Sequence, residues 1–108
     1  MAKVRLDTKK IKDWESFHLL CKSQFGFPDF YGTNMDAWID CLSYLNEDDG
    51  MSRFTLGKEE LLHIEITHTE DFNSRFPEIF DALVECSAFV NRRFVDAGEP
   101  PVLALLFL

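Results

Sequence analysis

Three stretches of the chain have the residue pattern of β-strands. Residues 3–7 (KVRLD) alternate between polar and apolar side chains, and residues 61–67 (LLHIEIT) are also typical of a strand. Residues 102–107 (VLALLF) form a continuous apolar run. Because such a run is typical of a strand that is buried on both faces, we expect it in the middle of a parallel sheet covered by helices.

The segment after the first predicted strand has the apolar spacing of a helix. This helix is expected from about Trp14 to Phe25, with Asp13 as its N-cap and Gly26 at its C-terminal end. The apolar stripe that would face the core consists of Trp14, Phe17, Cys21 and Phe25.

A second helix is expected to start near Met35, with either Thr33 or Asn34 as its N-cap. When successive residues are placed at 100° intervals, one side of this helix is apolar and holds Met35, Trp38, Cys41, Leu42 and Leu45. The opposite side holds Asp36, Asp40, Ser43 and Tyr44, and Ile39 lies on the border. The two aspartates therefore share an outward face.

The rest of the chain alternates loop, strand and helix. Residues 46–60 contain two glycines and a cluster of charges, so we expect a long loop there. A helical turn is expected to begin at Thr69 or Asp71, and a longer helix is expected from Pro77 to about Ala97. The segments between the predicted strands are long and contain helices, and connections of this kind favour parallel strands with right-handed crossovers. The sequence therefore predicts one α/β domain over residues 1–108, with a three-stranded parallel sheet packed with about four helices.

The formal net charge is −8, and most of it is concentrated in one segment. No basic residue occurs between Lys22 and Arg53, whereas six acidic residues do: Asp29, Asp36, Asp40, Glu47, Asp48 and Asp49. A surface of this sign repels a phosphate backbone, so we do not expect a nucleic acid as partner. The segment is either a solubilising face or a patch for a basic protein.

Other features favour a cytoplasmic protein without a cofactor or a metal. The first ten residues are too polar for a signal peptide, and residues 102–108 are too few to span a membrane. His63 and His68 would point to opposite faces of a strand, so we expect no metal site. The cysteines have no CxxC spacing and are expected to be buried free thiols at positions Cys21, Cys41 and Cys86.

Asp36 and Asp40 are one helical turn apart, where like charges repel by a few tenths of a kcal/mol. Asp36 gains about 0.3–1 kcal/mol from the helix dipole, but Asp40 lies beyond the first turn. No Lys or Arg occurs three or four residues away from Asp40. The pair is therefore either a solvated face or part of an interface. We favour an interface, because Tyr31, Ile39 and Tyr44 lie beside it.

Two carboxylates about 6 Å apart on a helix resemble successive phosphates of a nucleic acid in charge and spacing. A partner that binds phosphates through Arg, Lys and His could accept them. An enzyme that uses the same two aspartates as acid and base is a weaker alternative, because the sequence offers no nearby base or metal. We therefore expect a binding protein and no enzyme activity.

Residues 27–42 read FPDFYGTNMDAWIDCL and contain the pattern F-P-x-F/Y-Y-G-x-N-M/L-D-A-x-x-D-C-L. This segment resembles the barstar family, which are small intracellular inhibitors of secreted microbial ribonucleases. The resemblance implies a fold of three parallel strands packed with helices. It also implies that the second helix and the loop before it plug the active-site cleft of a basic ribonuclease.

Carried over by position, the resemblance implies a partner-binding surface and assigns roles to several of its residues. Asp40 would be the main anion, placed where the substrate's phosphate would sit, and Asp36 would pair with a basic residue of the enzyme. Phe30 would stack on the partner. The implied partner-binding residues are Phe30, Tyr31, Gly32, Asn34, Met35, Asp36, Ile39, Asp40, Ser43 and Tyr44.

The chain departs from the family's pattern at three contact positions. Ile39 and Leu45 stand where the family's prototype has tryptophan, and Arg93 stands where it has a glutamate that faces the enzyme. Residues 46–60 also make a longer connection. These departures keep a second hypothesis open, a non-inhibitory interaction or regulatory module on the same fold. In either case we expect a monomer when the protein is free.

Overall fold

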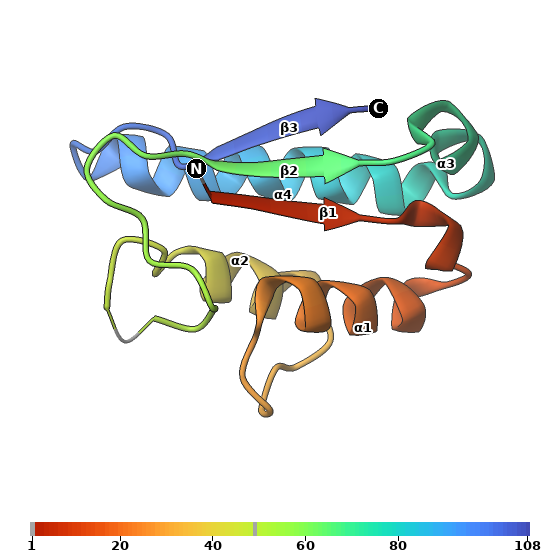
Figure 1. Cartoon of the computed structure of the whole chain (residues 1–108), viewed down its shortest axis with the longest axis horizontal. Coiled ribbons are helices and arrows are strands. Elements are labelled where there is room, and N and C mark those ends of the chain that lie inside the picture. The colour runs from red at the N-terminus through yellow and green to blue at the C-terminus, as the bar shows by residue number, and fades with distance from the viewer. Residues whose placement is uncertain (1, 49) are drawn as a thin grey trace.

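Three strands and four α-helices make up the part of the chain that the computed structural model describes, residues 2–48 and 50–108 (Figure 1). In chain order they are β1 (Ala2–Leu6), the 3-10 turn η1 (Thr8–Lys10), α1 (Trp14–Phe25), α2 (Met35–Leu42), β2 (Leu62–Ile66), α3 (Thr69–Arg75), α4 (Pro77–Asp96) and β3 (Leu103–Phe107). The predicted α/β fold, with a three-stranded parallel sheet and four helices, is confirmed. None of the helices in these residues is both long enough and apolar enough to cross a bilayer.

The strands lie in the order β1-β2-β3, and both neighbouring pairs are parallel. β2 is the central strand, and its Ile64 is paired with Val4 of β1 and with Leu105 of β3. The expectation that the last strand lies in the middle of the sheet is wrong. Both crossovers add the next strand on the same side of the sheet, so β3 is at an edge, where Leu106 and Phe107 are 39% and 53% exposed.

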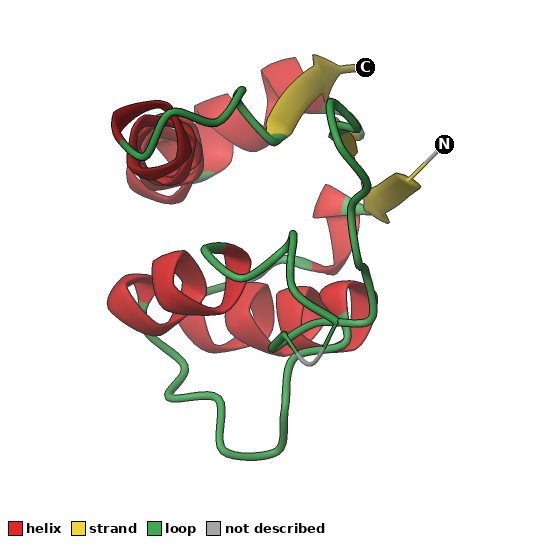
Figure 2. Cartoon of the chain, turned by 90° about the vertical axis from the view of Figure 1, so that its left-hand side faces the viewer, coloured by secondary structure: helices red, strands yellow, loops and turns green. Residues whose placement is uncertain are grey.

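One face of the sheet packs against the helices, which lie to one side of the strands in Figure 2. The side chains on this inner face are almost inaccessible to solvent and include Val4, Leu6, Leu62, Ile64 and Ile66. On the opposite face, Glu65 pairs with Lys3 at 3.9 Å and with Arg5 at 3.8 Å. The alternation of apolar and polar side chains along β1 and β2 therefore reflects one buried face and one solvated face of the sheet.

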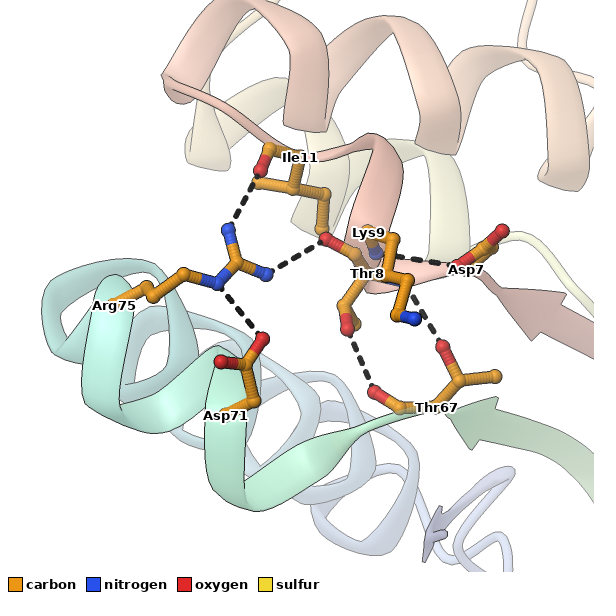
Figure 3. A network of polar contacts seen from close by, with 7 residues as sticks. All are labelled: Asp7, Thr8, Lys9, Ile11, Thr67, Asp71 and Arg75. Atoms are coloured by element: carbon orange, nitrogen blue, oxygen red, sulfur yellow. Dashed lines mark hydrogen bonds and ion pairs between the residues drawn. The ribbon is translucent and has the colours of Figure 1, made fainter.

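A polar network joins the start of the first crossover to the end of β2 (Figure 3). The backbone N–H of Thr8 donates to Thr67 Oγ1 at 3.0 Å, and the Thr8 hydroxyl donates to the Thr67 carbonyl at 2.7 Å. Arg75, the last residue of α3, donates to the carbonyls of Thr8 and Ile11, each at 3.3 Å. Its Nε also donates to Asp71 at 2.8 Å. These contacts fix the start of α1 relative to β2 and α3.

The core-facing side of α1 differs from the predicted stripe at its first residue. Trp14 is 39% exposed, because it lies at the helix start where fewer neighbours cover a side chain. His18 is buried instead, and the two rings stack with their centroids 6.0 Å apart. Among the cysteines, Cys21 and Cys41 are buried as expected, whereas Cys86 is only half-buried.

Candidate functional site

The α1–α2 loop, residues 27–34, is attached to the core by aromatic side chains. Gly26 reverses the chain at the end of α1 with a φ of +70°, and a Cβ at this position would lie 2.8 Å from Arg53 Cβ. The next residue, Phe27, stacks on Phe25 with the ring planes 5° apart and the centroids separated by 5.1 Å. The Phe27 ring also lies 4.7 Å from that of Tyr31. The base of the loop is therefore part of the core.

A buried hydrogen bond joins the same loop to α1. The Tyr31 hydroxyl lies 2.6 Å from Nδ1 of His18, and the two side chains are only 6% and 3% exposed. Burial lowers the pKa of His18 and raises the pKa of Tyr31. Both groups are thus held neutral near pH 7. The structure places Tyr31 inside the fold, where its ring and hydroxyl hold the loop in position.

Phe30, one residue before Tyr31, points the other way and is 76% exposed. It is the most exposed large hydrophobic side chain in the described residues, and aromatic side chains are common anchors of protein interfaces. The neighbouring Gly32 is also exposed, and a Cβ there would lie 3.3 Å from the side-chain nitrogen of Asn34. The loop therefore presents an aromatic ring and an open stretch of backbone to solvent.

Asn34 is the N-cap of α2, which decides between the two residues proposed from the sequence. Its Oδ1 accepts a hydrogen bond from the backbone N–H of Ala37 at 2.8 Å, and its Nδ2 donates to the Gly32 carbonyl at 3.2 Å. One side chain thus ties the exposed part of the loop to the first turn of α2. Met35 follows it and is half-buried against the core.

The outward face of α2, which we call the acidic face, contains Asp36, Ile39, Asp40 and Ser43. Both aspartates are exposed, while Ile39 and Ser43 are half-buried. The hydroxyl of Ser43 donates to the Ile39 carbonyl at 2.7 Å, and Tyr44 just beyond the helix is 41% exposed. The structure therefore brings together the outward-facing residues that the sequence predicted on this helix.

Asp40 lies between two shallow hollows. The hollow on the loop side is lined by Phe30, Tyr31, Gly32, Ala37, Asp40, Cys41 and Met51. The hollow on the other side, between α2 and α4, is lined by Asp36, Ile39, Asp40, Phe89 and Arg93. Asp40 thus borders both hollows, which places its carboxylate at the centre of the surface formed by the loop and the acidic face.

Asp40 has a counterion, although no Lys or Arg lies three or four residues away from it along the helix. Nη1 of Arg93 donates to Asp40 Oδ1 at 3.2 Å and to Ser43 Oγ at 3.1 Å. Residues three and four positions away on the same helix give no indication of this contact. Arg93 comes from α4, which packs beside α2, so the ion pair depends on the tertiary fold.

Two further positions around the site, one on α4 and one on the long loop after α2, were not identified by the sequence pattern. Phe89 is 48% exposed on α4, and the guanidinium carbon of Arg93 lies 5.1 Å from the centre of its ring. Met51, from the long loop after α2, lines the hollow beside Phe30. Leu45, a contact position in the resemblance, is fully buried. Sequence spacing carries no signal for Phe89 or Met51, because tertiary packing alone brings them beside α2.

The buried ionisable groups near the acidic face are kept neutral by their surroundings. Burial, with a smaller contribution from the charge of Asp40, raises the pKa of the Cys41 thiol to about 11, so it is not an activated nucleophile. The nearest buried histidine, His18, is already engaged with Tyr31. Within the described part of the chain, no three His, Cys, Asp or Glu side chains gather into a metal-binding group. What remains is an exposed, rigidly mounted anionic surface with an aromatic side chain at its edge.

Comparison with known proteins gives two matches. A family model described as "Barstar (barnase inhibitor)" matches residues 1–105. A curated protein of Bacillus subtilis (strain 168), named "Putative ribonuclease inhibitor YrdF", is 40% identical over 43 residues. This alignment covers 40% of the present chain and 47% of the relative, so the chain matches about half of that protein's length.

Proposed function

Since the chain belongs to the barstar family, we propose that it is an inhibitor of a basic microbial ribonuclease. In this proposal the α1–α2 loop and the acidic face enter the active-site cleft of the nuclease and block it. The observation that carries the proposal is that exposed Phe30 and the exposed Asp40 line one hollow, while exposed Asp36 lies one turn earlier on the same helix.

The carboxylates would occupy the positions that substrate phosphates take in the cleft. Asp40 lies at the centre of the surface and would receive the cationic groups that bind the scissile phosphate. Asp36, one turn earlier, would meet a second basic residue. Charge-assisted hydrogen bonds from Arg to a carboxylate are short and directional, so they give both affinity and orientation.

Apolar groups around the carboxylates would exclude water from these ion pairs. Phe30 would stack on the partner, and Ile39 and Met35 would add aliphatic contact beside the aspartates. Gly32 and Asn34 would allow close approach of the loop backbone, while Ser43 and Tyr44 would form the far edge. Aromatic anchors surrounded by neutral contacts are the usual source of affinity in protein interfaces.

The way the loop is held supports this proposal. The His18–Tyr31 hydrogen bond and the Asn34 cap fix the loop before any partner arrives. A preorganised loop loses little conformational entropy on binding, which leaves more of the contact energy as affinity. Tyr31, which the family resemblance assigns to the interface, would contribute mainly through this internal contact.

An inhibitor of this kind would act as an immunity protein in the cytoplasm of the cell that makes the nuclease, as one half of a toxin–antitoxin pair. The acidic surface would also steer a basic nuclease toward it, so association would be fast and would slow with added salt. Inhibition of this kind would need no nucleic acid, membrane or cofactor. The free protein would be a monomer, and its complex with the nuclease would be one-to-one.

The direct test compares the parent with a double variant, Asp36→Ala together with Asp40→Ala. Each protein is used to capture partners from the cells that produce it, and the captured proteins are assayed for ribonuclease activity. A matched control removes two exposed carboxylates elsewhere, Glu70→Ala with Glu78→Ala, in the first turns of α3 and α4. Figure 1 shows the start of these helices at the right-hand end of the molecule, away from α2.

A basic ribonuclease that is held and silenced by the parent and by the control, but not by the double variant, would support the proposal. If the double variant bound and inhibited the captured nuclease as well as the parent, the phosphate-mimic mechanism would be wrong. Net charge alone cannot produce the expected difference, because both variants lose two negative charges.

A second candidate function is a non-inhibitory interaction module on the same fold. The observation that favours it is the ion pair between Arg93 and Asp40, which already neutralises the residue expected to be the main anion. If this function is correct, the capture experiment should give a stable partner that has no nuclease activity and binds the parent and the double variant equally. The same capture experiment therefore separates the two functions.

A further inference from the structure

The side chain of Arg93 crosses from α4 to α2 and lies directly on the acidic face. A single nitrogen, Nη1, makes both polar contacts, with Asp40 Oδ1 at 3.2 Å and Ser43 Oγ at 3.1 Å. The ion pair is open to solvent, since the side chains of Arg93 and Asp40 are 46% and 62% exposed. The Phe89 ring lies below the guanidinium and supports this position.

In this geometry both residues of the ion pair keep hydrogen-bonding groups that are not used within the described structure. Within residues 2–48 and 50–108, Asp40 Oδ2 accepts no hydrogen bond, and Nε and Nη2 of Arg93 donate none. A cation from another protein could therefore still reach the free carboxylate oxygen. It would then lie beside Arg93, whose remaining N–H groups would face the same protein.

We infer that Arg93 is a selectivity element for the surface around Asp40. It disfavours a uniformly cationic partner and favours one that brings a hydrogen-bond acceptor, such as a carboxylate, next to the cation that reaches Asp40. This inference rests on the proposed function, because it specifies which kind of basic cleft the acidic face can accept. In this inference Arg93 selects partners by charge.

The size of the effect follows from two contributions. The first contribution is the ion pair itself, which a partner must weaken when it binds Asp40. An exposed ion pair typically changes an equilibrium constant by no more than about fivefold, so releasing Asp40 from Arg93 lowers the affinity only slightly. The larger contribution is repulsion between Arg93 and the incoming cation. At a separation of about 5 Å this repulsion corresponds to about fourfold in water and to more when the interface excludes water. Together they predict about a tenfold change in affinity.

The experiment uses two cationic probes, barnase and a hexa-arginine peptide. Their dissociation constants are measured by calorimetry for the parent and for Arg93→Gln, with side-chain NMR to locate peptide binding at Asp40. Arg92→Gln is the matched control, because Arg92 is the exposed neighbour on α4 and its replacement removes the same charge. Arg93→Lys keeps the charge and serves as the conservative variant.

The expected result is that Arg93→Gln binds barnase about tenfold more tightly than the parent and gains affinity for the peptide at Asp40. Arg92→Gln and Arg93→Lys should both stay within about threefold of the parent. Equal gains from Arg93→Gln and Arg92→Gln would mean that only net charge matters, and they would overturn the inference. An unchanged affinity of Arg93→Gln for both probes would overturn it as well.

The two probes separate this inference from the proposed function. If Arg93→Gln gains peptide binding at Asp40 while neither parent nor variant inhibits any ribonuclease, the inhibitor proposal fails and the role of Arg93 stands. If the parent captures and silences a ribonuclease but Arg93→Gln gains nothing with either probe, the role of Arg93 fails and the inhibitor proposal stands.

Discussion

Replacing Tyr31 by phenylalanine should destabilise the protein by removing one oxygen atom from its interior. The lost hydroxyl lies 2.6 Å from Nδ1 of His18, and His18 is 3% exposed, so water cannot take its place without opening the loop. A buried polar group without a partner costs about 1–3 kcal/mol. We therefore expect the free energy of unfolding of Tyr31→Phe to fall by about 1–3 kcal/mol.

The measurement is equilibrium unfolding in urea at pH 7.5, followed by circular dichroism. In a domain of this size, each kcal/mol should also lower the melting temperature by about 4–8 °C. Tyr44→Phe is the matched control, since it makes the same chemical change at a tyrosine that is 41% exposed. Its effect should stay within about 0.5 kcal/mol.

Equal stabilities of Tyr31→Phe and Tyr44→Phe would refute the reasoning, because the buried hydrogen bond would then contribute nothing. A second consequence concerns binding. If the bond holds the loop in its bound shape, Tyr31→Phe should also weaken ribonuclease binding, although its ring is only 6% exposed. A destabilised variant with unchanged binding would show that the loop keeps its shape without this bond.

Three further predictions concern pH, the exposed aromatic residue and the polar network. Because burial lowers the pKa of His18, the unfolded chain takes up a proton at this residue more readily than the folded protein does, so the free energy of unfolding should be constant above pH 6.5 and fall below it. His18→Gln should remove this pH dependence in urea titrations. Phe30→Ala should leave the free energy of unfolding within about 0.5 kcal/mol of the parent but weaken ribonuclease binding about 30-fold in calorimetry; an unchanged affinity would exclude it as an anchor. Thr67→Val should cost about 1–3 kcal/mol in urea unfolding by leaving the buried N–H of Thr8 without its acceptor, and a change below 0.5 kcal/mol would contradict the role of that network.

The features that follow from short-range chemistry could be read from the sequence. Asp13 and Gly26 bound α1 as expected, because a capping side chain and a left-handed glycine act on neighbouring backbone groups. Pro77 begins α4 for the same kind of reason. The outward direction of Asp36 and Asp40 follows from the helical repeat alone.

The features that depend on contacts between distant segments could not be read in this way. The apolar run of β3 does not reveal that the strand lies at an edge, because composition does not encode strand order. Arg93 is 53 positions away from Asp40, so local spacing could not identify it as the counterion. Likewise, nothing in the local pattern around Phe30 and Tyr31 tells which ring points into the core.

Phe30 and Tyr31 are adjacent in the chain but are constrained by different requirements. Tyr31 is constrained by folding, because its ring and hydroxyl complete the core, whereas Phe30 is constrained only by the partner that binds the surface. Substitutions at Phe30 and at the exposed Asp36 should therefore cost little in folding, so that recognition could change while the scaffold stays constant. The same separation makes the protein a practical starting point for directed evolution, with a library confined to the outward positions and the inward tyrosine left intact.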